Sequence, residues 1–82
     1  VNVLCDEGQA LEAALGLAAQ ICENAPLAVR ESRKIVIEAT DQPDEVGWKM
    51  SGEGIAKMFG TEDFNEGLTA FIEKRAPRWK GR

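Results

Sequence analysis

The chain has 82 residues, of which 44% are apolar and 29% charged, and its formal net charge is −4. This balance is typical of a globular domain, and no run approaches the roughly 18 apolar residues of a membrane-spanning helix, so we expect no membrane association. A chain of this size builds one small core at most, and we expect it to depend on a partner or a larger domain for stability.

The N-terminus and the cysteines limit the class further. The chain begins with Val1 rather than Met, and Asp6 and Glu7 stand where a secretory signal would carry basic residues. We therefore expect a segment of a longer, cytoplasmic protein. Cys5 and Cys22 are too few for a disulfide framework, and a zinc site would need unusual ligands because the chain has no His. We expect reduced thiols and no bound metal.

Two helices are predicted in the first half of the chain. Residues 9–24 place apolar side chains at three- and four-residue spacing, which is the period of a helix with one buried face. Those side chains are Leu11, Ala14, Leu15, Ala18, Ile21 and Cys22. A second helix is predicted over residues 26–40, because Pro26 suits the first turn of a helix, where its missing N–H is not needed.

A third helix is predicted over residues 44–58. Gly47, Gly52 and Gly54 lie in its interior and weaken it, since glycine has a low helix propensity. Gly60 is expected to cap its C-terminal end, because glycine adopts the backbone conformation that closes many helices.

A fourth helix begins after Thr61 or Asp63, both of which are good N-cap residues. Glu66 stands three residues after Asp63, in a capping-box-like pattern. The sequence Ala76-Pro77 is expected to close this helix, because the residue before a proline disfavours the α conformation. The last five residues then form an extended tail. No segment alternates apolar and polar residues as a strand would, so we predict an all-α fold, a small bundle of about four helices.

Catalysis by this chain alone is not expected. It contains no His and no Tyr, so no Ser or Cys has a local base. Glu62, Asp63 and Glu66 are close enough in sequence for acid–base work, but their place at a helix N-terminus explains them as caps and as partners of the helix dipole. Trp48 and Trp79 are expected to be packing residues. We assign no catalytic residue.

The charges are distributed unevenly along the chain. Five basic and all 14 acidic residues precede position 74, whereas the last nine residues carry five basic residues and no acidic one. A basic end on an acidic body fits either a solvated terminus or contact with an anionic partner.

The strongest local signal lies in residues 63–82, which read DFNEGLTAFIEKRAPRWKGR. They combine an acidic residue, Glu-Gly, Ala-Phe, Glu-Lys-Arg, and a Pro before a closing aromatic. A second motif lies upstream in residues 24–29, NAPLAV, and is followed by Lys34. In this order, the two motifs resemble the C-terminal part of the enoyl-CoA hydratase/isomerase enzymes, the crotonase superfamily, over essentially the whole chain.

The resemblance implies that residues 1–82 are the C-terminal helical segment of an enzyme acting on acyl-CoA thioesters, with hydration of trans-2-enoyl-CoA as the expected reaction. It also implies an upstream spiral α/β domain, outside this chain, that carries the oxyanion hole and the catalytic carboxylates. The segment would pack on that domain and on identical subunits of a trimer or a dimer of trimers. Alone it would be inactive. The expected ligand is the coenzyme A moiety of the substrate, with no covalently bound cofactor.

Two binding residues follow from the same resemblance. Members of the family place a Phe and a Lys three residues apart on the last helix, near the adenine and the phosphate of coenzyme A, and these correspond to Phe71 and Lys74. Residues at this spacing share a helix face, an aromatic ring can cover a purine, and an ammonium group can bind a phosphate. Without the resemblance, Phe71 would be a core residue and Lys74 a solvated charge.

The alternative function belongs to another class, a free-standing helical interaction module whose basic tail binds an anionic partner such as nucleic acid. A protein that binds nucleic acid is expected to carry basic residues along a helix face. Here they are confined to the C-terminus. We therefore expect no nucleic-acid binding.

Overall fold

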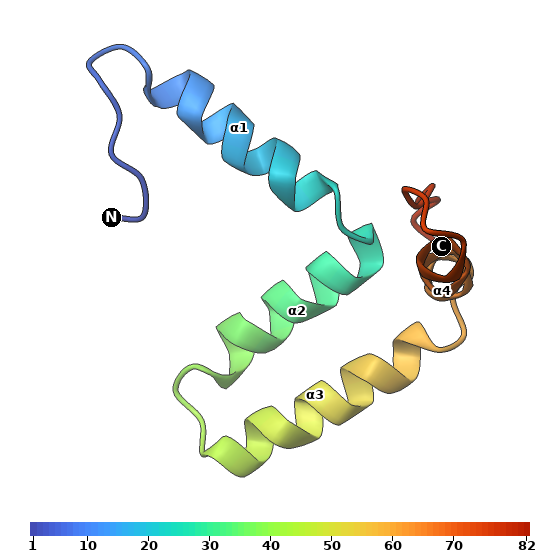
Figure 1. Cartoon of the computed structure of the whole chain (residues 1–82). Helices are drawn as coiled ribbons and strands as arrows, with labels where there is room; N and C mark the ends of the chain where they lie inside the picture. Colours follow the sequence, from blue (N-terminus) through green and yellow to red (C-terminus); the bar gives the residue numbers. More distant parts are fainter.

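The computed structural model describes residues 1–82 and contains four α-helices and no strand (Figure 1). The helices are α1 (Ala10–Cys22), α2 (Pro26–Ala39), α3 (Asp44–Met58) and α4 (Glu62–Glu73). The prediction of an all-α fold of about four helices is confirmed, and the first three helices begin and end within two residues of their predicted bounds. None of the four combines the length and the apolar character needed to cross a membrane.

Helices α2 and α3 form an antiparallel hairpin, which is the main packed unit of the chain (Figure 1). Gly54 of α3 is buried against α2, and a Cβ atom there would lie 2.9 Å from Ile35 Cδ1 and 3.1 Å from Glu31 Cγ. An ion pair joins the same two helices, with 2.6 Å between Lys57 Nζ and Glu31 Oε1. Gly54 therefore allows close approach of the two helices, in addition to its cost in helix propensity.

The start of α4 distinguishes between the two predicted caps. Thr61 is the N-cap: its hydroxyl oxygen accepts a hydrogen bond from the backbone N–H of Phe64 at 3.1 Å and donates one to the carbonyl of Met58 at 2.8 Å. Asp63 lies inside the first helical turn, so its predicted capping role is wrong. The prediction that Gly60 caps α3 is also wrong, because the C-cap is Phe59 and Gly60 does not adopt a positive φ.

The four helices form an open arrangement rather than a closed bundle. The chain extends over 44 × 39 × 18 Å, and only Gly54, Asp63 and Ala70 are buried. Trp48 is 77% exposed, so the prediction that it packs is not met within these 82 residues. Many other large apolar side chains are exposed, among them Leu11, Leu15, Val36, Ile37, Ile55, Phe59, Leu68, Phe71 and Ile72. So much exposed apolar surface is typical of a surface that contacts another protein segment.

Candidate functional site

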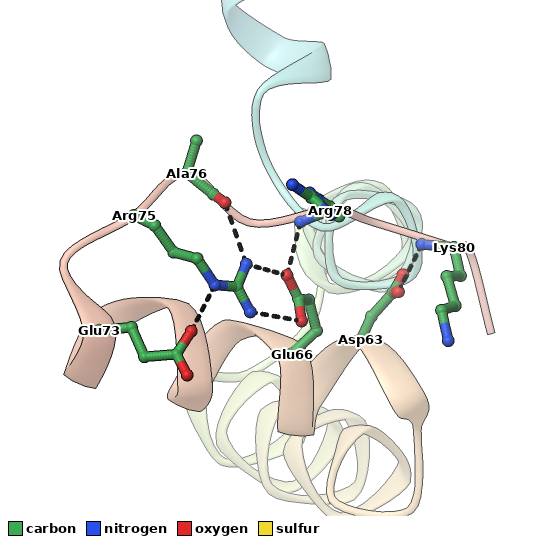
Figure 2. A network of polar contacts seen from close by, with 7 residues as sticks. All are labelled: Asp63, Glu66, Glu73, Arg75, Ala76, Arg78 and Lys80. Carbon is green, nitrogen blue, oxygen red and sulfur yellow. Dashed lines mark hydrogen bonds and ion pairs between the residues drawn. The ribbon is translucent and has the colours of Figure 1, made fainter.

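The last eight residues fold back over α4 instead of extending into solvent. We call residues 75–82 the C-terminal strap. Figure 2 shows two carboxylates of α4, those of Asp63 and Glu66, pointing towards backbone and side-chain donors of the strap. The tail is extended, as predicted, but it is held against α4 rather than free in solvent.

Asp63 holds the end of the strap. Its carboxylate accepts hydrogen bonds from the backbone N–H groups of Lys80 at 2.7 Å and Gly81 at 2.8 Å. Its own backbone N–H donates to the carbonyl oxygen of Arg82 at 3.0 Å. These bonds give the buried carboxylate two partners and explain its 2% exposure better than a capping role would.

Glu66 holds the beginning of the strap. Arg75 donates two hydrogen bonds to its carboxylate, from Nη1 to Oε1 at 2.6 Å and from Nη2 to Oε2 at 3.1 Å. The backbone N–H of Arg78 adds a third, to Oε1 at 2.7 Å (Figure 2). The paired guanidinium and the backbone N–H lower the pKa of Glu66 to about 2. Glu66 is therefore part of a charge-assisted network rather than a partner of the helix dipole alone.

Trp79 connects the strap to the first half of the chain. Its indole N–H donates to the carbonyl oxygen of Glu23, between α1 and α2, at 2.8 Å. Its ring lies over Gly67, where a Cβ atom would be 3.3 Å from the nearest ring carbon. The prediction that Trp79 is a packing residue is confirmed, and the absence of a side chain at Gly67 makes room for the ring.

The turn between α4 and the strap is centred on Lys74. Helix α4 ends at Glu73, earlier than predicted from Ala76-Pro77, because Lys74 adopts a left-handed conformation with φ 53° and ψ 42°. The backbone N–H of Lys74 donates to the carbonyl of Phe71 at 3.3 Å, and that of Arg75 donates to Ala70 at 3.0 Å. This is the bonding pattern of a Schellman motif, in which glycine is the usual left-handed residue.

Phe71 and Lys74 are both exposed at this end of α4. Phe71 belongs to the last turn of the helix and is 83% exposed. Lys74 is the first residue beyond the helix. The direction of its side chain is therefore set by the left-handed turn rather than by the helical spacing from Phe71 alone.

Most cations of the basic C-terminus are already paired within the chain. Arg75 forms ion pairs with Glu66 and Glu73. Glu62 forms two more, with Lys80 at 2.9 Å between Oε2 and Nζ and with Arg82 at 3.3 Å between Oε1 and Nε. Two of the five basic residues, Lys74 and Arg78, take part in no ion pair. Lys74 thus combines exposure with a charge that no carboxylate of this chain neutralises.

Elsewhere the chain offers apolar grooves and two cysteines but no metal-binding group. An open apolar groove of about 260 Å³ lies between the start of α2 and α4, and its one ionisable lining residue, Asp63, is occupied by the strap. The structure contains no group of three or more His, Cys, Asp or Glu side chains that could hold a metal ion. Cys5 and Cys22 are exposed and unpaired.

Comparisons with known proteins agree on one family. The sequence profile of enoyl-CoA hydratase/isomerase matches residues 1–82. A carnitinyl-CoA dehydratase from Salmonella typhi is 37% identical over the whole chain, which covers 33% of that protein. The crystal structure of an enoyl-CoA hydratase from Mycobacterium tuberculosis H37Rv superposes with a TM-score of 0.91 at 38% identity, and that of a probable enoyl-CoA hydratase/isomerase from Mycobacterium abscessus with 0.88 at 46%. Both cover 100% of this chain and 32% of the other. The chain thus spans about a third of the length of its relatives.

Proposed function

The chain belongs to the enoyl-CoA hydratase/isomerase family, and we propose that it forms the C-terminal helical part of a crotonase-type enzyme whose reaction is hydration of trans-2-enoyl-CoA. The names of its relatives support a site for coenzyme A. An enoyl-CoA hydratase and a carnitinyl-CoA dehydratase differ in the acyl group of their substrates and share the CoA moiety. A segment similar to both is therefore suited to the part of the substrate that they have in common.

In this proposal, the end of α4 binds the nucleotide end of coenzyme A. The observation that carries it is the exposed pair of Phe71 and Lys74, in which the aromatic ring is 83% exposed and the ammonium group has no carboxylate partner. A ring in this state can cover the adenine, and the ammonium group can bind a phosphate through a charge-assisted hydrogen bond.

The catalytic groups lie outside these 82 residues. The chain has no His or Tyr, and the carboxylates nearest to the proposed binding pair, Glu66 and Glu73, are occupied by Arg75. We propose that an upstream α/β domain supplies the oxyanion hole and the catalytic carboxylates. That domain and neighbouring identical subunits of a trimer or a dimer of trimers would cover the apolar side chains that are exposed here.

A free-standing module with a basic tail is the less favoured alternative. Such a module would need a cluster of free cations at the C-terminus. Three of the five, Arg75, Lys80 and Arg82, are paired with carboxylates of α4, so the strap carries much less free positive charge than its composition suggests.

Steady-state kinetics of the Lys74→Ala variant of the enzyme that carries this chain tests the proposal. Loss of a partly exposed contact to phosphate, on the order of 1 kcal/mol, raises KM for acyl-CoA severalfold and leaves kcat nearly unchanged, because the contact is the same in the ground and transition states. The rise in KM shrinks as salt screens the pair. An unchanged KM at low salt would show that Lys74 is a solvated surface charge that does not contact the phosphate.

A further inference from the structure

Lys74 occupies a backbone conformation that its residue type does not favour. It is the one residue other than glycine with a positive φ in the chain, and its turn reverses the backbone so that the strap can return along α4. Because a left-handed lysine is unfavourable in isolation, groups around the turn must stabilise it.

Besides the two backbone hydrogen bonds of the turn, the side chains of Glu66 and Arg75 bridge it. Arg75 directly follows Lys74, and its guanidinium group binds both carboxylate oxygens of Glu66, nine residues earlier on α4. The same carboxylate accepts the backbone N–H of Arg78, so Glu66 holds the chain on the far side of the turn at two points, Arg75 and Arg78 (Figure 2). A bidentate pair of this kind fixes direction as well as distance.

We propose that Glu66, through Arg75, is a positioning residue for Lys74, and that it holds the left-handed turn which directs the ammonium group at the phosphate of coenzyme A. Neither Glu66 nor Arg75 touches the nucleotide in this role. The inference rests on the proposed function of Lys74 and adds the device that sets its geometry. This role also explains why Arg75 forms ion pairs within the chain while the neighbouring Lys74 forms none.

The test is a double-mutant cycle in the enzyme that carries this chain, with Glu66→Gln, Lys74→Ala and the double variant. Glu66→Gln is expected to raise KM for acyl-CoA about two- to fivefold with little change in kcat, because the contact of Lys74 is weakened rather than removed. In the Lys74→Ala background the same change is expected to have no further effect, because the two residues act through one contact. With an acyl-pantetheine substrate, which lacks the nucleotide, Glu66→Gln is expected to leave KM unchanged.

Glu62→Gln is the matched control. Glu62 lies one turn earlier on α4 and also binds two cations of the strap, Lys80 and Arg82, yet it makes no contact at the Lys74 turn. Its variant is expected to keep the wild-type KM. Arg75→Lys is a second probe in case Glu66→Gln folds poorly. It keeps the positive charge, loses the bidentate geometry, and is expected to raise KM in the same way.

The outcomes separate the two proposals. If Lys74→Ala raises KM while Glu66→Gln and Arg75→Lys do not, the positioning role is overturned and the nucleotide site at Lys74 stands. A rise in KM from Glu66→Gln that persists undiminished in the Lys74→Ala background also overturns the positioning role. If Lys74→Ala itself leaves KM unchanged, both proposals fall.

Discussion

The backbone N–H of Asp63 donates a hydrogen bond to the carbonyl oxygen of Arg82, 3.0 Å away, so the first turn of α4 binds the last residue of the chain. The Asp63 carboxylate binds the two preceding residues of the strap through the N–H groups of Lys80 and Gly81. The C-terminus is therefore part of the fold.

Asp63→Asn is expected to release the end of the strap. An amide group presents one oxygen and one NH₂ where the carboxylate accepts two N–H groups, so one backbone donor loses its partner. Hydrogen bonds to a charged group contribute about 1.5–3 kcal/mol, and the protection of the Gly81 amide against hydrogen exchange is expected to fall by a factor of roughly 10 to 100. Thr69→Ala, at an exposed position of α4 without a side-chain hydrogen bond, is the control. Equal protection of Gly81 in the wild type and Asp63→Asn would contradict the role of Asp63.

Acid is expected to loosen the strap at Glu66. Its pKa is lowered to about 2 in the fold from an ordinary value of 4.5, first by the hydrogen bonds from Arg75 and then by the N–H of Arg78. Because the pKa is lower in the folded state, the ionised Glu66 carboxylate stabilises the fold above pH 4.5. This stabilisation is lost as the pH falls from 4.5 towards 2. The indole N–H signal of Trp79 in an NMR titration reports on the strap. Its native shift is expected to persist down to about pH 4 and to change below it. A change centred above pH 4.5 would show that another group controls the strap.

The two glycines near the middle of α3 are expected to respond differently to alanine. At Gly52 a new Cβ meets no other part of this chain within 4 Å, so Gly52→Ala is expected to stabilise α3 by up to about 1 kcal/mol through helix propensity. At Gly54 the new Cβ meets Ile35 Cδ1 at 2.9 Å and Glu31 Cγ at 3.1 Å. Overpacking costs about 1–3 kcal/mol, so Gly54→Ala is expected to be the less stable of the two variants. Thermal denaturation of both variants tests this prediction. Equal stability would show that α2 shifts to make room for the new Cβ at position 54 without loss of stability.

The isolated 82 residues are expected to show no hydratase activity, because the oxyanion hole and the catalytic carboxylates are proposed to lie in an upstream domain. Spectrophotometric loss of crotonyl-CoA is a sufficient assay, with the complete enzyme as the positive control. Turnover above background by the isolated chain would place catalytic groups within it.

Sedimentation of the same sample over a concentration series is expected to show self-association, since many large apolar side chains are exposed.

Local sequence patterns predicted the helices well and the ends of α4 less well. Thr61 and Asp63 are both favourable N-caps, and the pattern around them contains nothing about Lys80 and Gly81, which bind Asp63 from 17 and 18 residues away. The end at Glu73 was missed for a similar reason. Proline was the one local stop signal, whereas the helix ends at a left-handed lysine, next to Arg75, which binds Glu66 of the same helix.

The candidate site was predicted in part. Phe71 and Lys74 came from the resemblance to a family, and neither position has a compositional signal of its own. The pairing of Arg75, Lys80 and Arg82 with α4 could not be predicted, because it depends on the path of the strap. Counting charges in the sequence therefore overstated the anion-binding capacity of the C-terminus and gave no reason to distinguish Lys74 from its neighbours.

The most direct measurement of the central claim is inhibition by adenosine 3′,5′-bisphosphate, which is the nucleotide end of coenzyme A without its pantetheine and acyl parts. We expect it to compete with acyl-CoA in the enzyme that carries this chain. Lys74→Ala is expected to weaken the inhibition severalfold at low salt, since a charge-assisted phosphate contact is lost. Lys49→Ala, which removes an exposed lysine of α3 that is in no ion pair, is expected to leave it unchanged. Equal inhibition of the wild type and Lys74→Ala would contradict the assignment of the nucleotide site to the end of α4.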